Sequence, residues 1–216
     1  MISIESPVRR VSGEVFDFAE MQRIAAFARD NRIGLHLDGA RLFLASAYTG
    51  ISPAKYAALF DTVYVSLYKY FNAAGGAVLA GPRALLEDLY HQRRMFGGGL
   101  RQAWPYAAVA LHYLDGFSER FGQAATAADT LFEALAEHEG CRILRSAAST
   151  NVTRLLVRGG SAAALPERLL ARGIAIRTAQ SSGADEAEFE LFTNETILRR
   201  PAAELIEVFI EALGTG

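Results

Sequence analysis

The stretches LHLDGARLF, residues 35–43, and VYVSLYKYFNAAGGAVLAG, residues 63–81, decide the fold of this chain. Each begins with a short apolar run that is typical of a buried strand. The first run ends at Asp38 and the second at Lys69, so polar groups follow both strands directly. Ligands of open α/β sheets bind just outside the carboxyl ends of the strands. We therefore expect the two strand ends to share one functional site.

Around these stretches, the sequence alternates between strand and helix patterns. Residues 1–5 have the pattern of a strand. Asp17 and Glu20 have the spacing of a capping box and predict a helix that ends near Asn31. Another helix is expected from Pro53, at the first helical position. Strand, helix, strand is typical of a parallel sheet, so the sequence predicts an α/β fold.

The second half of the chain predicts a smaller unit. A helix is expected from residue 82 to residue 95, followed by a glycine run and then by helical pattern over residues 102–138, with interruptions near Gly116 and Gly122. We place a domain boundary there, between residues 1–122 and residues 123–216. The smaller α/β domain is expected to contain strands near residues 151–157, 174–178 and 188–193, and helices near residues 165–172 and 201–213.

Composition narrows the classes of function. The chain has 216 residues, of which 51% are hydrophobic and 21% charged, enough for a sizeable core. A net charge of −2 without a basic stripe does not favour a nucleic-acid partner. The single cysteine, Cys141, excludes an internal disulfide framework and is expected to be a buried, inert thiol. Because neither a membrane span nor a signal peptide is evident, we expect a cytoplasmic protein without a membrane partner.

Lys69 is the strongest chemical feature of the sequence. A lysine directly after a buried strand is expected to be partly shielded from water, which suits an amine that forms a Schiff base with a carbonyl, above all with pyridoxal phosphate. The structural alternative is a lysine whose ammonium extends from the strand end to water. If Lys69 is the only residue considered, the lysine that extends to water is the favoured interpretation.

Asp38 and Arg41 favour the cofactor. An enzyme of this kind needs a carboxylate at the pyridine nitrogen, and Asp38 follows the neighbouring strand. Arg41, in the next turn, would reach the phenolic oxygen of the cofactor or the carboxylate of an amino acid with its forked guanidinium. The alternative is that Asp38 caps the following helix and pairs with Arg41 at the surface.

Other polar residues give weaker indications. Ser66 and the glycines Gly75 and Gly76 would fit beside a phosphate, although glycines after a strand more often form a turn. Arg101 follows the glycine run and is expected at the start of a helix, where anions bind. Isolated histidines such as His36 supply no set of three ligands, so we expect no metal site.

Three motifs in this order, HLDGARLF, SLYKYFNAAGGAVLAG and RRMFGGGLRQAWPYAAVALHYL, resemble the low-specificity threonine aldolases of the β-eliminating lyase group. The resemblance covers roughly the first half of the chain. It implies the aminotransferase-like fold of pyridoxal-phosphate enzymes: the C-terminal part of the large domain, a mostly parallel sheet with flanking helices, at residues 1–122, and a small α/β domain at residues 123–216. It also implies a homodimer or homotetramer with sites between subunits.

The resemblance further implies roles for individual residues. Lys69 would carry the cofactor covalently, Asp38 would hold its pyridine nitrogen, Arg41 would lie by the phenolic oxygen and the substrate carboxylate, and Arg101 near a phosphate. The implied reaction is cleavage of the Cα–Cβ bond of a β-hydroxy amino acid, which turns threonine into glycine and acetaldehyde. Alternatives are another enzyme of this fold, a β-eliminating lyase or an aminotransferase, and an inactive truncated fragment that acts as a scaffold or assembly partner.

Two departures from the family pattern are expected to matter. Met1 falls where the family is already in mid-domain, so we expect the preceding strands and part of the cofactor cradle to be missing from this chain. In the small domain, the family has an arginine that opens a strand of the form RLVTH and binds the substrate carboxylate. The similar segment here, ELFTN, begins with Glu190, and Arg177 is the candidate substitute.

Overall fold

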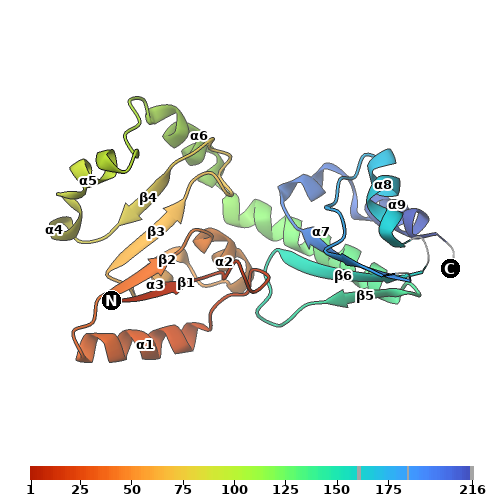
Figure 1. Ribbon diagram of the computed structural model, residues 1–216, viewed down its shortest axis with the longest axis horizontal. Helices are drawn as coiled ribbons and strands as arrows, with labels where there is room; N and C mark the ends of the chain where they lie inside the picture. Colours follow the sequence, from red (N-terminus) through yellow and green to blue (C-terminus); the bar gives the residue numbers. More distant parts are fainter. Residues whose placement is uncertain (160–161, 184, 215–216) are drawn as a thin grey trace. The chain divides into compact units, whose positions relative to one another are not determined.

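The computed structural model describes residues 1–159, 162–183 and 185–214, which form two compact units (Figure 1). The first unit is Met1–Ser118 and the second is Glu119–Gly216. This division falls inside helix α7 (Phe117–Glu137), the same helix that contains the expected boundary between residues 122 and 123. The two units are described separately below.

The first unit is built on a four-stranded sheet with the strand order β1-β2-β3-β4. Strands β1 (Ile2–Glu5), β2 (Leu35–Asp38) and β3 (Thr62–Ser66) are parallel, and β4 (Ala77–Ala80) returns antiparallel to β3. The mostly parallel α/β sheet expected from the sequence is therefore confirmed. Strands β2 and β3 end at the two places where the sequence predicts a functional site.

One face of this sheet carries the hydrophobic core. Helices α1 (Phe18–Asp30), α2 (Leu42–Thr49) and α3 (Pro53–Ala57) contribute side chains to it. Alternation along the strands directs their apolar side chains to this face and their polar ones to the other. The buried cluster consists of Ile4, Met21, Leu37, Leu42, Ala45, Tyr56 and Val63. The polar side chains of all three parallel strands are consequently left together on the opposite face.

Side-chain caps start the two helices predicted from turn chemistry. Asp17 Oδ1 accepts a hydrogen bond from Glu20 N (2.8 Å), as expected, and α1 begins at the next residue. The Glu20 carboxylate pairs with Arg23 instead of completing a capping box. Ser52 Oγ accepts from Lys55 N (3.3 Å) ahead of α3. Helix α3 begins at Pro53, as expected, and ends at Ala57.

Between β4 and α7 the chain forms three helices. The single helix expected from residue 82 to residue 95 is wrong, because the chain breaks into α4 (Arg83–Leu86) and α5 (Leu89–Met95). Helix α6 (Trp104–Leu114) follows and ends before Gly116, where a positive φ of 65° turns the chain as predicted. The expected break at Gly122 is also wrong. A helix-interior glycine costs only about 1 kcal/mol, which the buried face of α7 outweighs.

The second unit is a four-stranded antiparallel sheet packed against helices. Its strand order is β5-β6-β8-β7. The strands are β5 (Cys141–Leu144), β6 (Val152–Arg158), β7 (Ser181–Ser182) and β8 (Glu186–Phe192), and the helices besides α7 are η1 (Ala162–Ala164), α8 (Leu165–Ala171), η2 (Glu195–Arg199) and α9 (Ala202–Leu213). The α/β class expected for the smaller unit is therefore confirmed.

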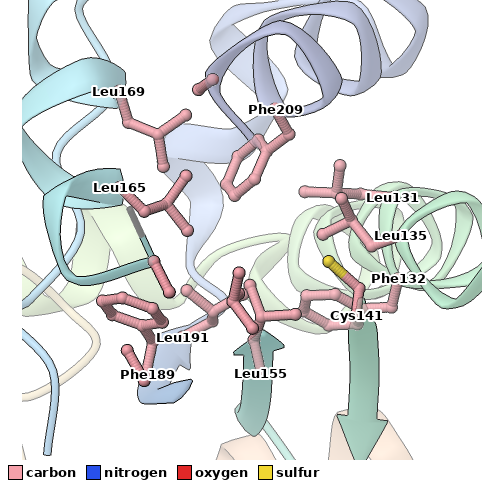
Figure 2. Close-up of a cluster of buried hydrophobic side chains, with 14 of the residues drawn as sticks. Leu131, Phe132, Leu135, Cys141, Leu155, Leu165, Leu169, Phe189, Leu191 and Phe209 are labelled. Carbon is pink, nitrogen blue, oxygen red and sulfur yellow. The ribbon is translucent and has the colours of Figure 1, made fainter. Parts of the chain in front are cut away.

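The core of the second unit lies between this sheet and helices α7, α8 and α9. Figure 2 shows Leu165, Leu169 and Phe209 from the helices on one side and Leu155 and Phe189 from the strands on the other. Cys141 joins the same cluster from β5, and burial raises the pKa of its thiol. The prediction that this cysteine is buried is confirmed.

The sequence predicted a strand at residues 174–178, which is wrong, and did not predict β5. Ile174 and Ile176 alternate as in a strand, and both pack on the core. However, the chain leaves α8 through Gly173 (φ 78°), and Ile174 N still donates to Leu169 O (2.9 Å). This contact holds the start of the segment to the helix. The strand that pairs with the edge of β8 away from β6 is instead β7, which is two residues long.

The outer face of the second sheet carries cross-strand ion pairs. Arg154 pairs with Glu188 (3.2 Å) and Arg158 with Glu186 (3.1 Å). These arginines are therefore occupied by carboxylates of β8.

Among the described residues, no helix combines the length and the apolar character needed to cross a membrane.

Candidate functional site

A row of polar side chains crosses the first sheet at the carboxyl ends of its parallel strands. Glu5 of β1 is registered opposite Asp38 of β2, and Asp38 is registered opposite Tyr64 of β3. Residues paired across adjacent strands point to the same face. The three side chains therefore lie side by side on the face opposite the apolar core. Sequence analysis singled out Asp38 and missed its two neighbours.

Asp38 closes the turn after β2 and does not cap the following helix. Its Oδ1 atom accepts a hydrogen bond from Ala40 N (3.2 Å). Helix α2 begins one residue after Arg41, which occupies the N-cap position without a side-chain capping bond. The capping alternative for Asp38 is therefore wrong. The carboxylate is half-buried at the end of its strand, as a ligand site requires.

Arg41 is directed toward Glu5 by an ion pair. Its Nη1 atom lies 3.8 Å from Glu5 Oε1, and 17% of the Arg41 side chain is exposed. The alternative interpretation, in which Arg41 pairs with Asp38 at the surface, is wrong, because the structure pairs Arg41 with Glu5. A largely buried guanidinium held by one long contact keeps donors for a second carboxylate. Glu5 has a positioning role that the sequence did not suggest.

Ser66 is the last residue of β3, and its hydroxyl is buried. The residue is 1% exposed, and Oγ makes no hydrogen bond of acceptable geometry among the described residues, although it is near enough to the Tyr64 phenol to affect that group's pKa. A buried hydroxyl without a partner costs about 1–3 kcal/mol. A hydroxyl of this kind at a strand end is suited to hydrogen-bond an oxygen of a bound ligand. The residues present therefore fit a cofactor that carries a phosphate.

The phenol of Tyr64 is held in its neutral form. Burial is the main cause that raises its pKa, and the nearby Tyr68 and the charge of Asp38 raise it further. A neutral phenol remains a hydrogen-bond donor next to the carboxylate. Its place could have been found in the sequence, because Tyr64 lies two residues before Ser66 and alternation puts both on one face of the strand.

Lys69 lies in the turn that follows β3, three residues beyond Ser66. Its side chain is half-buried, and Nζ lies 5.5 Å from the centroid of the Tyr68 ring. The lysine therefore comes from the same sheet edge as Asp38, on the adjacent strand. The structure thus brings together the carboxyl ends of β2 and β3, as expected from the sequence.

The turn that carries Lys69 is anchored by an aromatic residue. Phe71 is 3% exposed, and its ring packs edge-on against Phe43 of α2 and Phe117 of α7, at 5.2 Å between centroids in each case. Aromatic pairs of this geometry add to the free energy gained from burial. Phe71 therefore fixes one end of the lysine-bearing turn, a role that sequence analysis did not identify.

The glycines of the second motif form a turn. Leu67 N donates to Gly76 O (3.1 Å), and Gly76 has a φ of 98°. A Cβ atom at Gly75 would meet nothing within 4 Å. Both observations favour the structural interpretation of these glycines over a tight phosphate cradle.

Two predicted site arginines lie away from these strand ends along the chain. Arg101 is exposed in the loop before α6, three residues ahead of Trp104, so its expected position at the start of the helix is wrong. Arg177 belongs to the second unit, where its guanidinium stacks on the Phe192 ring at 4.0 Å from the centroid. Glu190 of the same unit accepts a hydrogen bond from Gln180 Nε2 (3.3 Å).

Histidine in the first sheet is used for structure. His36 Nδ1 lies 2.9 Å from Thr62 Oγ1 on the adjacent strand, in hydrogen-bond contact. Within the part of the chain that the structure describes, no three side chains of His, Cys, Asp or Glu are grouped so that they would hold a metal ion.

A mostly parallel sheet with a carboxylate and a lysine after adjacent strands defines an α/β scaffold of the pyridoxal-phosphate enzyme class. Comparison with known proteins assigns it more narrowly. The beta-eliminating lyase family model matches residues 1–157, and the chain belongs to this family. Enzymes of the family depend on pyridoxal phosphate.

The relatives are mainly threonine aldolases. A low-specificity L-threonine aldolase of Candida albicans is 40% identical over 115 residues, which cover 53% of this chain and 30% of the relative. An alanine racemase of Cochliobolus carbonum is 36% identical over 123 residues, 57% of this chain and 31% of that protein. The matched segments thus span under a third of the length of either relative.

Structural comparison agrees over nearly the whole chain. The structure of a Listeria monocytogenes protein assigned as an L-allo-threonine aldolase superposes with a TM-score of 0.83 at 28% identity. The match covers 98% of this chain and 60% of that one. Both units described here therefore have counterparts in one solved protein.

Proposed function

We propose that this chain acts as a pyridoxal-phosphate-dependent lyase that cleaves the Cα–Cβ bond of β-hydroxy amino acids, in the manner of a threonine aldolase. Threonine would yield glycine and acetaldehyde. The observation that carries the proposal is the placement of Asp38 and Lys69 after adjacent strands of the same sheet, inside the segment that the family matches. The names of most of these relatives support the type of reaction.

The residues at the strand ends fit the cofactor. Lys69 would bind it covalently, Asp38 would accept a hydrogen bond from its ring nitrogen, and the unpaired Ser66 hydroxyl would donate to its phosphate. When bound, pyridoxal phosphate supplies an electron-withdrawing ring that takes up the electrons of the bond that breaks. The position of Arg101 near a phosphate stays a prediction.

The chain's own groups then have distinct tasks. Asp38 would keep the cofactor's ring nitrogen protonated, and the neutral phenol of Tyr64 beside it can donate a hydrogen bond without adding a second negative charge. The free amine of Lys69 would act as a base beside the reacting carbon and move a proton there. Phe71 holds the turn so that the amine stays at the strand end.

Two arginines are proposed for the substrate carboxylate. Arg41 is held by Glu5 alone among the described acidic residues, and a forked guanidinium can bind a second carboxylate. Arg177 is the candidate from the second unit, because the family resemblance implies an arginine at the position of Glu190. A homodimer or homotetramer and a cytoplasmic location stay predictions.

The chain has only two lysines, which makes a clean test possible. Pyridoxal phosphate added to the purified protein should produce a visible absorption band, and borohydride reduction should leave the cofactor mass on the peptide that contains Lys69. Lys69→Ala should lose both signals, whereas Lys55→Ala, at an exposed position in α3, should keep them. Labelling of Lys55 alone, or no band in any variant, would contradict the proposal and favour an inactive scaffold.

Product analysis distinguishes the reactions. Glycine and acetaldehyde formed from threonine support the aldolase. The alanine racemase among the relatives favours a second candidate, proton exchange at Cα, which would convert L-alanine to its D form without breaking a carbon–carbon bond. Ammonia release or amino transfer to a keto acid would instead indicate a β-eliminating lyase or an aminotransferase.

A further inference from the structure

The amine of Lys69 lies over the aromatic ring of the preceding residue. Its Nζ atom is 5.5 Å from the centroid of the Tyr68 ring, within the distance of about 6 Å at which the face of a ring attracts a cation. No described carboxylate forms an ion pair with this lysine. Because a lysine side chain is long and flexible, its place in the turn does not determine where the amine lies. The contact with Tyr68 is therefore the interaction that orients the amine.

The ring of Tyr68 needs an anchor of its own. The residue is 50% exposed in the turn after β3, so the core does not hold it. Its hydroxyl interacts with the phenol of Tyr64 by hydrogen bond, and this interaction is one of the causes that raise the pKa of Tyr64. A hydrogen bond that raises the pKa of an acid stabilises the protonated form. Tyr64 is therefore the donor, and the oxygen of Tyr68 is the acceptor.

Tyr64 is suited to hold another side chain because its backbone is fixed on both sides. It is registered opposite Asp38 of β2 on one side and opposite Leu79 of β4 on the other. A strand inside a sheet is less mobile than the turn that follows it. The hydrogen bond between the two phenols therefore ties the turn to the strand from which the turn leaves.

These contacts form a continuous row at the sheet edge. The row begins at Asp38, which is the cross-strand neighbour of Tyr64. It continues from Tyr64 through the Tyr68 ring to the Lys69 amine. The residue proposed for the cofactor's ring nitrogen and the residue proposed for its covalent attachment are thus connected by two phenols.

We propose that Tyr68 is a positioning residue for Lys69: its ring holds the amine at the sheet edge, and the Tyr64 hydroxyl holds the ring. The inference rests on the proposed function, because it concerns the lysine that would bind the cofactor. It goes further by assigning the position of the amine to two tyrosines. The competing interpretation is a lysine whose ammonium extends to water, for which neither tyrosine would affect the amine.

The first test needs no cofactor. Reductive methylation with isotopically labelled formaldehyde marks both lysines and keeps their positive charge, and Lys69→Ala identifies the NMR signal of Lys69. The face of an aromatic ring shields nearby nuclei, so the methyl signal of Lys69 should be displaced upfield and should show a nuclear Overhauser effect to the Tyr68 ring. Lys55 is the internal reference, because no described aromatic ring lies under its amine.

Variants of the two tyrosines separate the ring from the hydroxyls. Tyr68→Leu should abolish the displacement, and Tyr68→Phe, which keeps the ring but not the hydrogen bond, should reduce it. Tyr64→Phe should reduce it equally, and the double variant no further, because either change breaks the same bond. Tyr90→Leu is the matched control and should have no effect, since its ring is similarly exposed (54%) and lies under Arg93 and Arg94.

A second measurement uses pyridoxal phosphate. The concentration that gives half of the visible absorption band should rise about two- to tenfold in Tyr68→Leu, because a lysine that is no longer held must be ordered when it attaches. Tyr68→Phe should raise it less. The two failures are distinguishable: no band in the unaltered chain contradicts the proposed lyase function, whereas the methyl signals decide the positioning role without any cofactor.

The outcomes that would overturn the inference are specific. A Lys69 signal without displacement in the unaltered chain, or a displacement that persists in Tyr68→Leu, would contradict the role of the ring. An equal displacement in Tyr64→Phe and the unaltered chain, or a double variant that loses more than either single one, would contradict the role of the Tyr64 hydroxyl. An unchanged melting temperature verifies that each variant is folded.

Discussion

Asp38 and Tyr64 are direct cross-strand neighbours on β2 and β3, with the carboxylate and the phenol on the same face of the sheet. The charge of Asp38 is one of the causes that raise the pKa of Tyr64, after burial and alongside Tyr68. The phenol therefore reports on the charge at the position proposed for the cofactor's ring nitrogen.

This relationship can be tested by titration. In Asp38→Asn the negative charge is removed, so the pKa of Tyr64 should fall toward its ordinary value of 10.0. The fall should be partial, because burial is the larger cause. Tyrosine ultraviolet absorbance or NMR of labelled tyrosine measures it, and Tyr64→Phe identifies the transition by its loss. A Tyr64 pKa that stays the same in Asp38→Asn would contradict the coupling.

Gly39, directly after Asp38, is predicted to be required for the turn. A Cβ atom there would lie 3.0 Å from Tyr64 O and 3.2 Å from Leu42 Cβ. We expect Gly39→Ala to destabilise the fold by about 1–3 kcal/mol, because neighbouring backbone must shift. Urea unfolding measures this. Gly75→Ala is the matched control, since a Cβ atom there meets nothing and its φ is not positive; a larger loss in Gly75→Ala would refute the interpretation.

The buried thiol of Cys141 should make stability fall at alkaline pH. Burial raises its pKa above the ordinary value of 9.0, so the unfolded chain loses this proton at lower pH than the folded protein. The contribution is complete below the unfolded value and is lost as the pH rises through the folded value. Urea unfolding from pH 7 to pH 10 should show a decline that is shallower in Cys141→Ala. An equally steep decline in that variant would assign the effect to other groups, such as Tyr56.

Leu155 of β6 belongs to the cluster in Figure 2 and is 0% exposed. Leu155→Ala should lower the free energy of unfolding by about 2–5 kcal/mol, because it leaves a cavity in a packed core. Leu170 is 63% exposed on α8, and Leu170→Ala should change stability by no more than about 0.5 kcal/mol. Similar losses in the two variants would show that the core is not centred on β6.

Much of the first unit could be predicted from the sequence because its signals are local. Alternating side chains and a polar stop identified β2 and β3, and with them Asp38 and Lys69, within a few residues of each strand. The sequence signal for the helix cap at Asp17 was equally local, because it involves only Asp17 and Glu20. Where structure depends only on neighbours along the chain, residue patterns are sufficient.

The remaining features depend on partners far away in the sequence. The alternation of residues 174–178 predicts a strand, but pairing also needs an available edge, and the contact of Ile174 with α8 keeps the segment from it. Glu5 contacts Arg41 only because β1 and β2 are adjacent. The anchoring role of Phe71 depends on Phe43 of α2 and Phe117 of α7, which are distant from it in the sequence.

The single-sided core of the first sheet has a consequence for the site. Strand β2 buries Leu35 and Leu37 and directs His36 and Asp38 to the other face. A slip of β2 by one residue against its neighbours would exchange the two sets and put a carboxylate into the core. The free energy that fixes the register of this strand is thus the same free energy that keeps the carboxylate in place. Selection for a well-packed core would preserve the geometry of the reaction centre even in a chain that no longer uses it.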